Sequence, residues 1–527
     1  MQISWLSLLP PLAVLISAFI TRKLNISLLL GIITGALIAS DGSLSSALSL
    51  VIDRSFKQII DIDYLYMYGF LILIGSLVIM ISKNGGALSF AHAITTKVRS
   101  KVGVETSSML LSSLLFMDDY LSSLTAGYVM RPLTDRFSIP RAKLAYLVHS
   151  LSGPLVILVP VSSWVAMITS QLESSGVGLD GSTARISSDA FFLYVYSIPC
   201  IFYSLLLIAS VWFVVHMRIS YGPMKEQERI ASHTHNLFGG KPSITYKHDD
   251  QPNERGSTAD LVLPLLVLVG AAFLGILYSG GYCLLGGCND LITALRNNRN
   301  TFQALFGASL IAFIFSSVFG VIRTTVTARQ LPSMVRSGFD LMKNAIIMVI
   351  LASTLGTILK LDLNVGAYVA HLASGTIAPA LLPVIFFIVS SIVSTVTGSS
   401  WGTIALMLPG TIQMLTTLLD VSTPASPCEI PLLLPVLGAI FSGAVCGDHI
   451  SPISETTIMA ATSSGAYPID HTITQFFYAL PAILGSLVAF TIAGYTASLG
   501  TSLMIYCSLG AGLCCTFGLL WLFNKIK

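Results

Sequence analysis

Charged side chains are scarce in this sequence. Asp, Glu, Lys and Arg make up only 10% of the 527 residues, whereas 54% are hydrophobic, and the mean hydropathy is +0.81. A soluble chain normally carries about a quarter charged residues, so this composition excludes an ordinary soluble protein. Repeated apolar runs, many near the ~20 residues that cross a bilayer as a helix, predict an all-α polytopic membrane protein instead.

Other features are missing as well. No basic tract with interleaved aromatic residues is present, which argues against nucleic-acid binding. The eight cysteines show no zinc-binding spacing, and neither an enzyme nor a resident cofactor is predicted. A cleavable signal peptide is not expected, because no basic segment precedes the first apolar run. Cys283 and Cys288 share a short polar loop and are either disulfide-bonded or free.

Basic residues in short loops orient the predicted spans. Residues 5–20 cross inward to Arg22 and Lys23, which places the N-terminus outside, and residues 26–40 return. Residues 145–170 and 191–216 are each expected to form one crossing. The last span ends at Lys525, which places the C-terminus inside. With hairpins included, we expect about 11–13 membrane segments in the cytoplasmic membrane of a prokaryote.

One long hydrophilic stretch, residues 218–260, interrupts the apolar pattern and is rich in Lys and Arg. It is therefore predicted to be a cytoplasmic linker between two halves. The expected organisation is a first transmembrane half, the linker, a second transmembrane half and a C-terminal transmembrane helix, with the bounds 1–217, 218–260, 261–500 and 501–527.

Two apolar runs contain polar interruptions and indicate re-entrant hairpins. Residues 106–130 are broken at Asp118 and Asp119 and have basic residues on both sides, so this hairpin should open to the cytoplasm. Residues 383–413 are broken within 397–403 and should be entered from outside. Because the loop charges orient the two halves oppositely, the sequence predicts two inverted-topology repeats, a common design of secondary transporters.

The densest polar string is GDHISPISETT at residues 447–457, between two apolar runs. Pro452 lacks a backbone N–H and clashes with the preceding turn, so the helix should break there. Ionisable groups at membrane depth typically mark an ion or substrate pathway. We expect four polar breaks to converge near the midplane of the membrane, at residues 118–123, 149–154, 397–403 and 448–456.

The breaks supply the candidate site. Carboxylate and hydroxyl oxygens suit a hard cation such as sodium. The candidate cation- or substrate-binding residues are Asp118, Asp119, Ser122, His149, Ser150, Thr397, Ser399, Ser400, Asp448, His449, Ser451, Ser454, Glu455 and Thr456. Asp119 and Asp448 are the candidates for transient contact with Na+. The sequence leaves open which of the adjacent Asp118 and Asp119 faces the site and which caps a helix or pairs with an arginine.

Two of these candidates, His149 and His449, titrate near neutrality and could carry protons or sense pH. A histidine packed between helices and bonded to a hydroxyl is an equally good interpretation of either residue.

These motifs resemble the NhaC family of sodium/proton antiporters. The matching stretches are FMDDYLSSLTAGYVMRPLTDRFSIPRAKLAYLVHS at 116–150, PVSSW at 160–164, TGSSWGT at 397–403 and GDHISPISETTI at 447–458. The resemblance implies an inverted-repeat transporter that exchanges Na+ for H+ across the membrane by alternating access. It also implies that the aspartates and the Ser/Thr-rich breaks form the cation site.

Two positions depart from the family pattern, which often has an acid in place of His149 and an aspartate in place of Glu455. The departure bears on stoichiometry and substrate, so an alternative function is a Na+- or H+-coupled carrier of an organic acid or amino acid. The expected partners are Na+, H+ and the lipid bilayer, and a homodimer is left open.

Overall fold

The computed structural model describes residues 5–21, 23–95, 98–179, 184–244, 255–296 and 300–525. This part of the chain is largely helical, as expected where backbone polar groups must be satisfied within each segment. Its sheet consists of two short parallel strands, β1 (Val177–Gly178) and β2 (Ile186–Ser187).

The helices of the first half and the linker are α1 (Leu9–Thr21), α2 (Leu24–Ala39), α3 (Leu44–Ile60), α4 (Ile62–Asn84), α5 (Gly86–Thr95), α6 (Lys101–Leu114), α7 (Asp119–Arg136), α8 (Arg141–His149), α9 (Gly153–Val156), α10 (Ser163–Ser174), α11 (Ala190–Ser197), α12 (Phe202–His216) and α13 (Gly222–Thr234). Those of the second half are α14 (Ala259–Ser279), α15 (Leu291–Arg296), α16 (Thr301–Ile322), α17 (Leu331–Thr357), α18 (Val365–Ala373), α19 (Leu382–Thr397), α20 (Ser400–Leu418), α21 (Leu433–Ile450), α22 (Glu455–Ser464), α23 (Pro468–Thr496) and α24 (Thr501–Lys525). Short 3-10 turns are η1 (Trp5–Leu8), η2 (Ile198–Cys200), η3 (Cys283–Leu285), η4 (Ala328–Gln330), η6 (Pro379–Leu381), η7 (Pro427–Glu429) and η8 (Ala497–Leu499), and η5 (Ile358–Asp362) is a π-helical turn that continues α17.

The chain is a multi-pass membrane protein. Within the described ranges, eight helices are long and apolar enough to cross a membrane, and α11 with α12 makes a ninth that is bent by 47°. The single crossing predicted over 191–216 is therefore bent, because Pro199 in the turn before the bend has no N–H to continue a regular helix. Cys283 and Cys288 are exposed free thiols.

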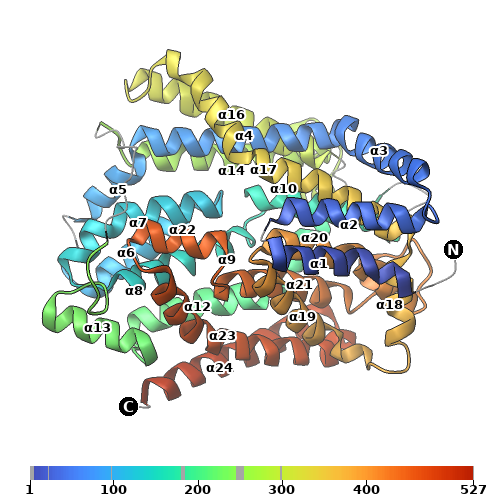
Figure 1. The fold of residues 1–527 in the computed structure, drawn as a ribbon. Helices are drawn as coiled ribbons and strands as arrows, with labels where there is room; N and C mark the ends of the chain where they lie inside the picture. The colour runs from blue at the N-terminus through green and yellow to red at the C-terminus, as the bar shows by residue number, and fades with distance from the viewer. Residues whose placement is uncertain are drawn as a thin grey trace.

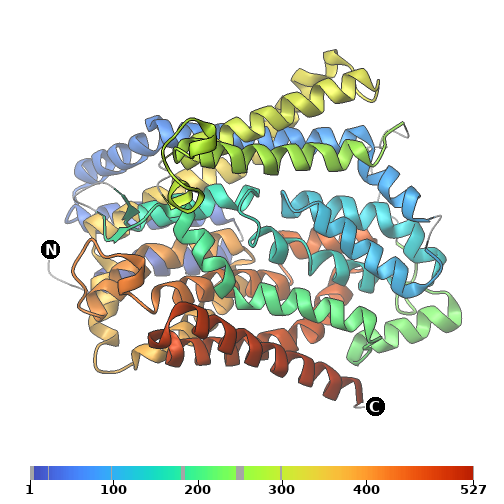
Figure 2. The same cartoon turned by 180° about the vertical axis from the view of Figure 1, so that it is seen from behind.

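The long helices lie roughly side by side, and the chain enters α1 and leaves α24 at opposite ends of the molecule (Figures 1 and 2). We call one of these the basic end: it holds the linker helix α13 and the ends of α7, α12 and α24 (Figure 1). Helices α7 and α24 end at Arg136 and Lys525, and Arg218 follows the end of α12 by two residues. The loop between α20 and α21 carries Asp420 and Glu429 and contains no Lys or Arg. The basic end is thus the one that the charge rule predicts to face the cytoplasm.

Helices α1 and α2 correct one prediction. They pack against each other but are short: η1 with α1 (Trp5–Thr21) has 17 residues and α2 has 16, fewer than the ~20 that cross a ~30 Å hydrocarbon core at about 1.5 Å per residue. Their shared turn reaches only the middle of the molecule (Figure 1), where the exposed Lys23 lines a cavity. The two full crossings predicted over 5–40 are wrong, and this segment is a half-length hairpin. Arg22 lies outside the described residues.

The breaks predicted from polar residues are present. Helix α6 ends at Leu114 and α7 begins at Asp119, α19 and α20 are separated by residues 398–399, and α21 and α22 by residues 451–454, which include Pro452. Each of the first two pairs packs as a hairpin. The crossing predicted over 145–170 is not one continuous helix, because α8, α9 and α10 are separate pieces with a further break at residues 157–162, which include Pro160.

Close packing of α19 against α21 fixes the position of the polar string. Gly443 and Gly447 lie four residues apart on α21, and a Cβ atom on Gly447 would lie only 2.3 Å from the Ser391 carbonyl oxygen of α19. Small residues at this spacing let two membrane helices approach closely. The Ser394 hydroxyl of α19 also donates to the Ala444 carbonyl at 2.5 Å. The last turn of α21 is therefore held against the first hairpin arm of the second half.

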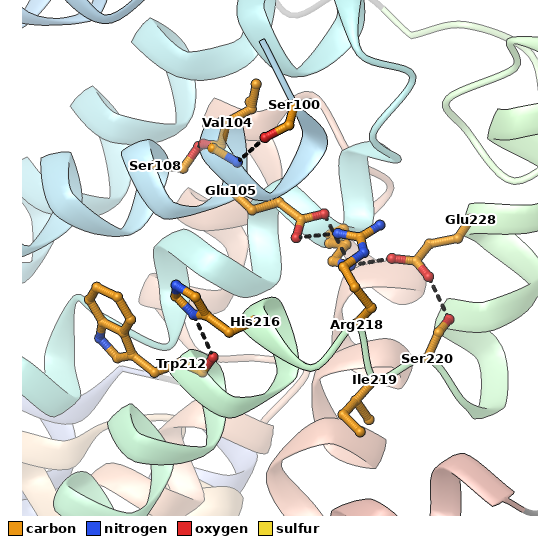
Figure 3. Close-up of polar contacts among 12 residues, drawn as sticks. Ser100, Val104, Glu105, Ser108, Trp212, His216, Arg218, Ile219, Ser220 and Glu228 are labelled. Carbon is orange, nitrogen blue, oxygen red and sulfur yellow. Dashed lines mark hydrogen bonds and ion pairs between the residues drawn. The ribbon is translucent and has the colours of Figure 1, made fainter. Parts of the chain in front are cut away.

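A buried ion network anchors the linker. Lys143 of α8 is 1% exposed and pairs with Glu105 of α6 at 3.1 Å and with Glu228 of α13. Arg218 approaches the other oxygen of Glu105 at 2.9 Å, and Figure 3 shows these two side chains facing each other. Ser220 donates to Glu228 in the same view. These contacts hold α13 against the transmembrane helices.

The network yields a stability prediction. Lys143→Ala leaves two carboxylates near each other with less positive charge, and losing one partner of a buried ion pair costs about 3 kcal/mol or more. The matched control is Lys57→Ala, because Lys57 pairs with Asp53 at 3.1 Å but is 63% exposed, and such a pair contributes about 1 kcal/mol or less. Thermal unfolding of the purified proteins in detergent should show a much larger loss for Lys143→Ala. Equal shifts would contradict the anchoring role.

Candidate functional site

The broken helices surround a cavity of about 650 Å³. Its polar lining comes from the starts of α2 and α7, from α17, from the α19–α20 hairpin, and from the end of α21 and the start of α22. It consists of Lys23, Asn25, Asp118, Asp119, Tyr120, Asp340, Asn344, Thr397, Ser399, Ser400, Asp448, Glu455 and Thr456. Trp164 and Trp401 add an aromatic wall, with ring centroids 6.1 Å apart. Helices from both halves of the chain therefore meet at one cavity.

Asp448 lies in the last turn of α21, and hydroxyl groups hold both of its carboxylate oxygens. Ser454 donates to Oδ1 and Thr456 donates to Oδ2, each at 2.7 Å. Ser454 is also the N-cap of α22, where it accepts a bond from the Thr457 amide. The start of a helix carries a partial positive charge that favours a nearby carboxylate. Neutral donors and a helix end thus position Asp448 at the cavity.

Asp118 and Asp119 have different surroundings. Asp118 is the N-cap of α7: its Oδ1 accepts from the Leu121 amide at 3.1 Å, and its Oδ2 accepts from the Ser163 hydroxyl at 2.9 Å. Asp119 is the first residue of α7 and is 3% exposed, and its Oδ1 has no hydrogen-bond partner in the described structure. Both oxygens of Asp118 are occupied, whereas Asp119 brings an unpaired carboxylate oxygen to the cavity.

The tip of the α19–α20 hairpin provides three hydroxyls. Gly398 has a φ of 65°, which ends α19 in a left-handed conformation that suits glycine. Ser399 then caps α20 by accepting from the Gly402 amide at 3.2 Å, and Ser400 donates to the Ala444 carbonyl at 3.1 Å. Thr397 makes only long bonds, of 3.4 Å to the Ser394 carbonyl and 3.5 Å to the Ser399 carbonyl. Hydroxyl oxygens that donate to carbonyls keep lone pairs for another ligand.

Eight of the fourteen candidate residues line the cavity. The other six do not line it: Ser122, His149, Ser150, His449, Ser451 and Ser454. Ser122 and Ser451 donate to the backbone carbonyls of Ser112 and Thr395. Three of the four predicted breaks therefore reach the cavity. The fourth, at His149, reaches it only through a 3.2 Å contact with Thr456, because α8 packs behind α22.

Sequence reasoning missed Tyr120 as a partner in the site. Its hydroxyl donates to Glu455 at 2.7 Å, and its side chain lines both the cavity and a second cleft of about 430 Å³. The second cleft also touches Lys83 and Gln330, which lie at the ends of α4 and η4. In the sequence Tyr120 directly follows the two aspartates, and this position could have identified it as a site residue.

Two further polar residues, His471 and Gln475, were also missed. They lie one helical turn apart on one face of α23 and are both fully buried. Their spacing of four residues could have placed them on one helix face. They were missed because the strongly apolar part of that helix begins after His471.

Comparison with known proteins places the chain in a family. A sequence model described as the Na+/H+ antiporter family matches residues 155–495. An uncharacterized protein of Haemophilus influenzae is 31% identical over 505 residues, which cover 93% of this chain and 91% of the relative. The chain belongs to the Na+/H+ antiporter family. As a member it is a secondary transporter and not an enzyme.

Of two other similarities, one covers a short part of the chain and the other has low sequence identity. A Bacillus subtilis protein named Malate-2H(+)/Na(+)-lactate antiporter is 31% identical over 144 residues, 25% of this chain and 28% of the relative. The crystal structure of the Alcanivorax borkumensis YdaH transporter aligns with a TM-score of 0.53 and 14% identity, over 84% of this chain and 90% of that one. At such identity the structural likeness shows a shared fold.

The different surroundings of the two aspartates can be tested by stability. Asp118→Ala removes the cap of α7 and the partner of Ser163, which should cost about 2 kcal/mol. Asp118→Asn keeps a cap acceptor and should cost little. Asp119→Asn should not lower stability, since the Asp119 Oδ1 has no partner to lose. Thermal melts of the three variants measure this order, and a larger loss for Asp119→Asn than for Asp118→Ala would refute it.

Proposed function

We propose that this protein exchanges Na+ for H+ across the cytoplasmic membrane by alternating access, with Asp448 and Asp119 as the carboxylates that bind either ion. The observation that carries the proposal is the pairing of two unlike carboxylates in one cavity. Asp448 is held by two neutral hydroxyls, and Asp119 has an oxygen without a partner in the described structure. Membership of the Na+/H+ antiporter family supports the same reading.

The chemistry follows from the cost of unpaired charge inside a membrane protein. A carboxylate away from water is unfavourable unless a counter-charge is present. Na+ provides that charge when it is bound, and a proton on the carboxylate removes the need for it when Na+ has left. One site that holds Na+ or a proton, but not both together, is sufficient to couple their movements in opposite directions.

The oxygen atoms that line the cavity suit reversible binding of a sodium ion. In the described ranges, no group of three or more His, Cys, Asp or Glu side chains is placed to hold a metal ion. Hydroxyl and carbonyl oxygens, such as those of Thr397 and Ser400, would therefore complete the shell around a sodium ion together with the carboxylates. Transport requires binding that is strong enough to admit an ion and weak enough to release it.

We assign cytoplasmic access to the cleft beyond Tyr120, which touches the ends of α4 and η4. In this assignment the basic end faces the cytoplasm, the N-terminus lies outside and the C-terminus inside. The halves at 1–217 and 261–500 act as inverted repeats around the cavity, 218–260 is the cytoplasmic linker, and α24 is an additional helix. The meeting of broken helices from both halves at one cavity supports this division.

Neutralising either carboxylate tests the proposal. Asp448→Asn and Asp119→Asn each keep the side-chain shape but remove the exchangeable charge, so each should abolish Na+-dependent proton movement in proteoliposomes. The matched control is Asp420→Asn: Asp420 is exposed in the loop after α20, and its φ of 49° is one that asparagine adopts readily. Near-normal exchange by a folded Asp448→Asn protein would rule Asp448 out as the shared site.

A second candidate function is coupled transport of an organic acid. Lys23 and Asn25 line the cavity, and a volume of about 650 Å³ lies within the range of small-molecule sites. The name of the Bacillus subtilis relative points the same way. A lysine in the cavity would bind a substrate carboxylate, whereas it would repel a sodium ion.

Lys23→Gln separates the two functions because they predict opposite signs. For a cation exchanger, loss of the positive charge should lower the Na+ concentration needed for half-maximal exchange by roughly several-fold. For an organic-acid carrier, the same change should abolish transport. The assay compares Na+-driven proton movement in proteoliposomes with and without malate and lactate. Proton movement that requires an organic acid, and that Lys23→Gln abolishes, would replace the proposed function with the second one.

A further inference from the structure

A chain of hydrogen bonds leads away from Asp448 on the side opposite the cavity. The Thr456 hydroxyl, which donates to Asp448 Oδ2, also contacts His149 Nε2 at 3.2 Å. His149 Nδ1 contacts His471 Nε2 at 3.0 Å. Both imidazoles are at most 1% exposed. Three elements, α22, α8 and α23, thus join in one continuous line of exchangeable protons.

The positions of the protons along this line follow from the donors. The single Thr456 hydroxyl proton is directed to Asp448, so Thr456 must accept from His149 Nε2–H. A neutral His149 then has an unprotonated Nδ1, which accepts from His471 Nε2–H. His471 Nδ1 is left with a lone pair, and in the described structure this buried atom has no hydrogen-bond partner. The chain therefore ends in a vacant proton acceptor.

We propose that His471, His149 and Thr456 form a proton relay between Asp448 and the linker side of α23, separate from the path of the cation. This inference rests on the proposed exchange of Na+ for H+. A proton that binds His471 Nδ1 releases the Nε2 proton to His149 Nδ1. His149 passes its Nε2 proton to Thr456, and the Thr456 hydroxyl proton moves to Asp448 Oδ2. No group gains or loses a net proton except Asp448.

A proton that leaves Asp448 for the linker side passes through the same atoms in reverse order. This direction requires the other tautomer of each histidine. One transfer leaves both imidazoles protonated on the other nitrogen, so a second transfer in the same direction requires the two rings and the Thr456 hydroxyl to turn back to their starting orientation between turnovers. The arrangement requires each histidine to offer both ring nitrogens, one to each neighbour. No other side chain supplies an acceptor and a donor on opposite sides of a ring in this way.

The far end of the relay lies near the surface at the basic end. His471 is in the first turn of α23, next to Asp470, which pairs with Lys241 of the linker at 2.6 Å. The cavity, in contrast, meets the second cleft at Tyr120 on α7. Protons and cations thus have different routes to the carboxylate that they share.

His449 flanks the relay without being part of it. Its ring lies edge-on to that of His149 with centroids 4.4 Å apart, and Tyr203 and Gln475 bond to its nitrogens. These groups fill the space beside His149 and keep its ring aligned with Thr456 and His471.

The test is to separate proton coupling from sodium binding with His471→Gln. Its amide can donate to His149 as His471 Nε2–H does, but it cannot pass a proton on. In proteoliposomes, Na+ uptake driven by a pH gradient should fall about tenfold or more, whereas exchange of labelled Na+ for unlabelled Na+ at equal pH should be unchanged. His149→Gln should give the same split. The matched control is His216→Gln, because His216 is an exposed histidine on α12.

Size-exclusion and thermal-melt profiles confirm that each variant is folded, and the two relay variants test the proposal independently if one is unstable. Folded relay variants that keep full pH-driven uptake would overturn the relay alone, as would variants that lose both activities together. A wild-type protein that moves no Na+ in either assay would overturn the proposed function, and the relay with it.

Discussion

The constraint on which the rest depends is the placement of Asp448 inside a membrane-spanning bundle with hydroxyl groups on both carboxylate oxygens. Ser454 and Thr456 donate to it from the break and the first turn of α22, and the start of that helix adds a favourable partial charge. Neutral donors lower the cost of the charge without cancelling it. Binding of either a cation or a proton therefore still stabilises the carboxylate, and a coupled exchanger uses the competition between the two ions.

The breaks in the helices make this placement of Asp448 possible. An unbroken helix would satisfy its own backbone and present no free ends, whereas α7, α20 and α22 each begin at the cavity with a side-chain cap, from Asp118, Ser399 and Ser454. Glycines let α21 lie against α19 closely enough to hold the break in place. The buried network at Lys143 fixes α8, which carries His149 at its other end. Packing far from the cavity thus determines the geometry at Asp448.

Much of this arrangement was predictable from the sequence, because the signals are local. Pro452 and the interruption at Asp118 and Asp119 marked real breaks, and the interruption predicted within 397–403 is the tip of the α19–α20 hairpin. The half-length α1–α2 hairpin was not predictable, since an apolar run followed by Lys23 has the same pattern whether it crosses the membrane or turns at a cavity. The roles of Asp118 and Asp119 depend on Ser163, 45 residues away, and His149 meets His471 from 322 residues away. Such long-range contacts leave no trace in local periodicity.

The central claim is that Na+ and a proton compete for Asp448. The most direct measurement is the number of protons released when Na+ binds to the purified protein in detergent, followed by titration calorimetry in buffers of different ionisation enthalpy. The account predicts that Na+ binding by the wild-type protein displaces protons, and that Asp448→Asn removes this release while the control Asp420→Asn keeps it. Sodium binding without proton release, or the same release from Asp448→Asn, would contradict the account.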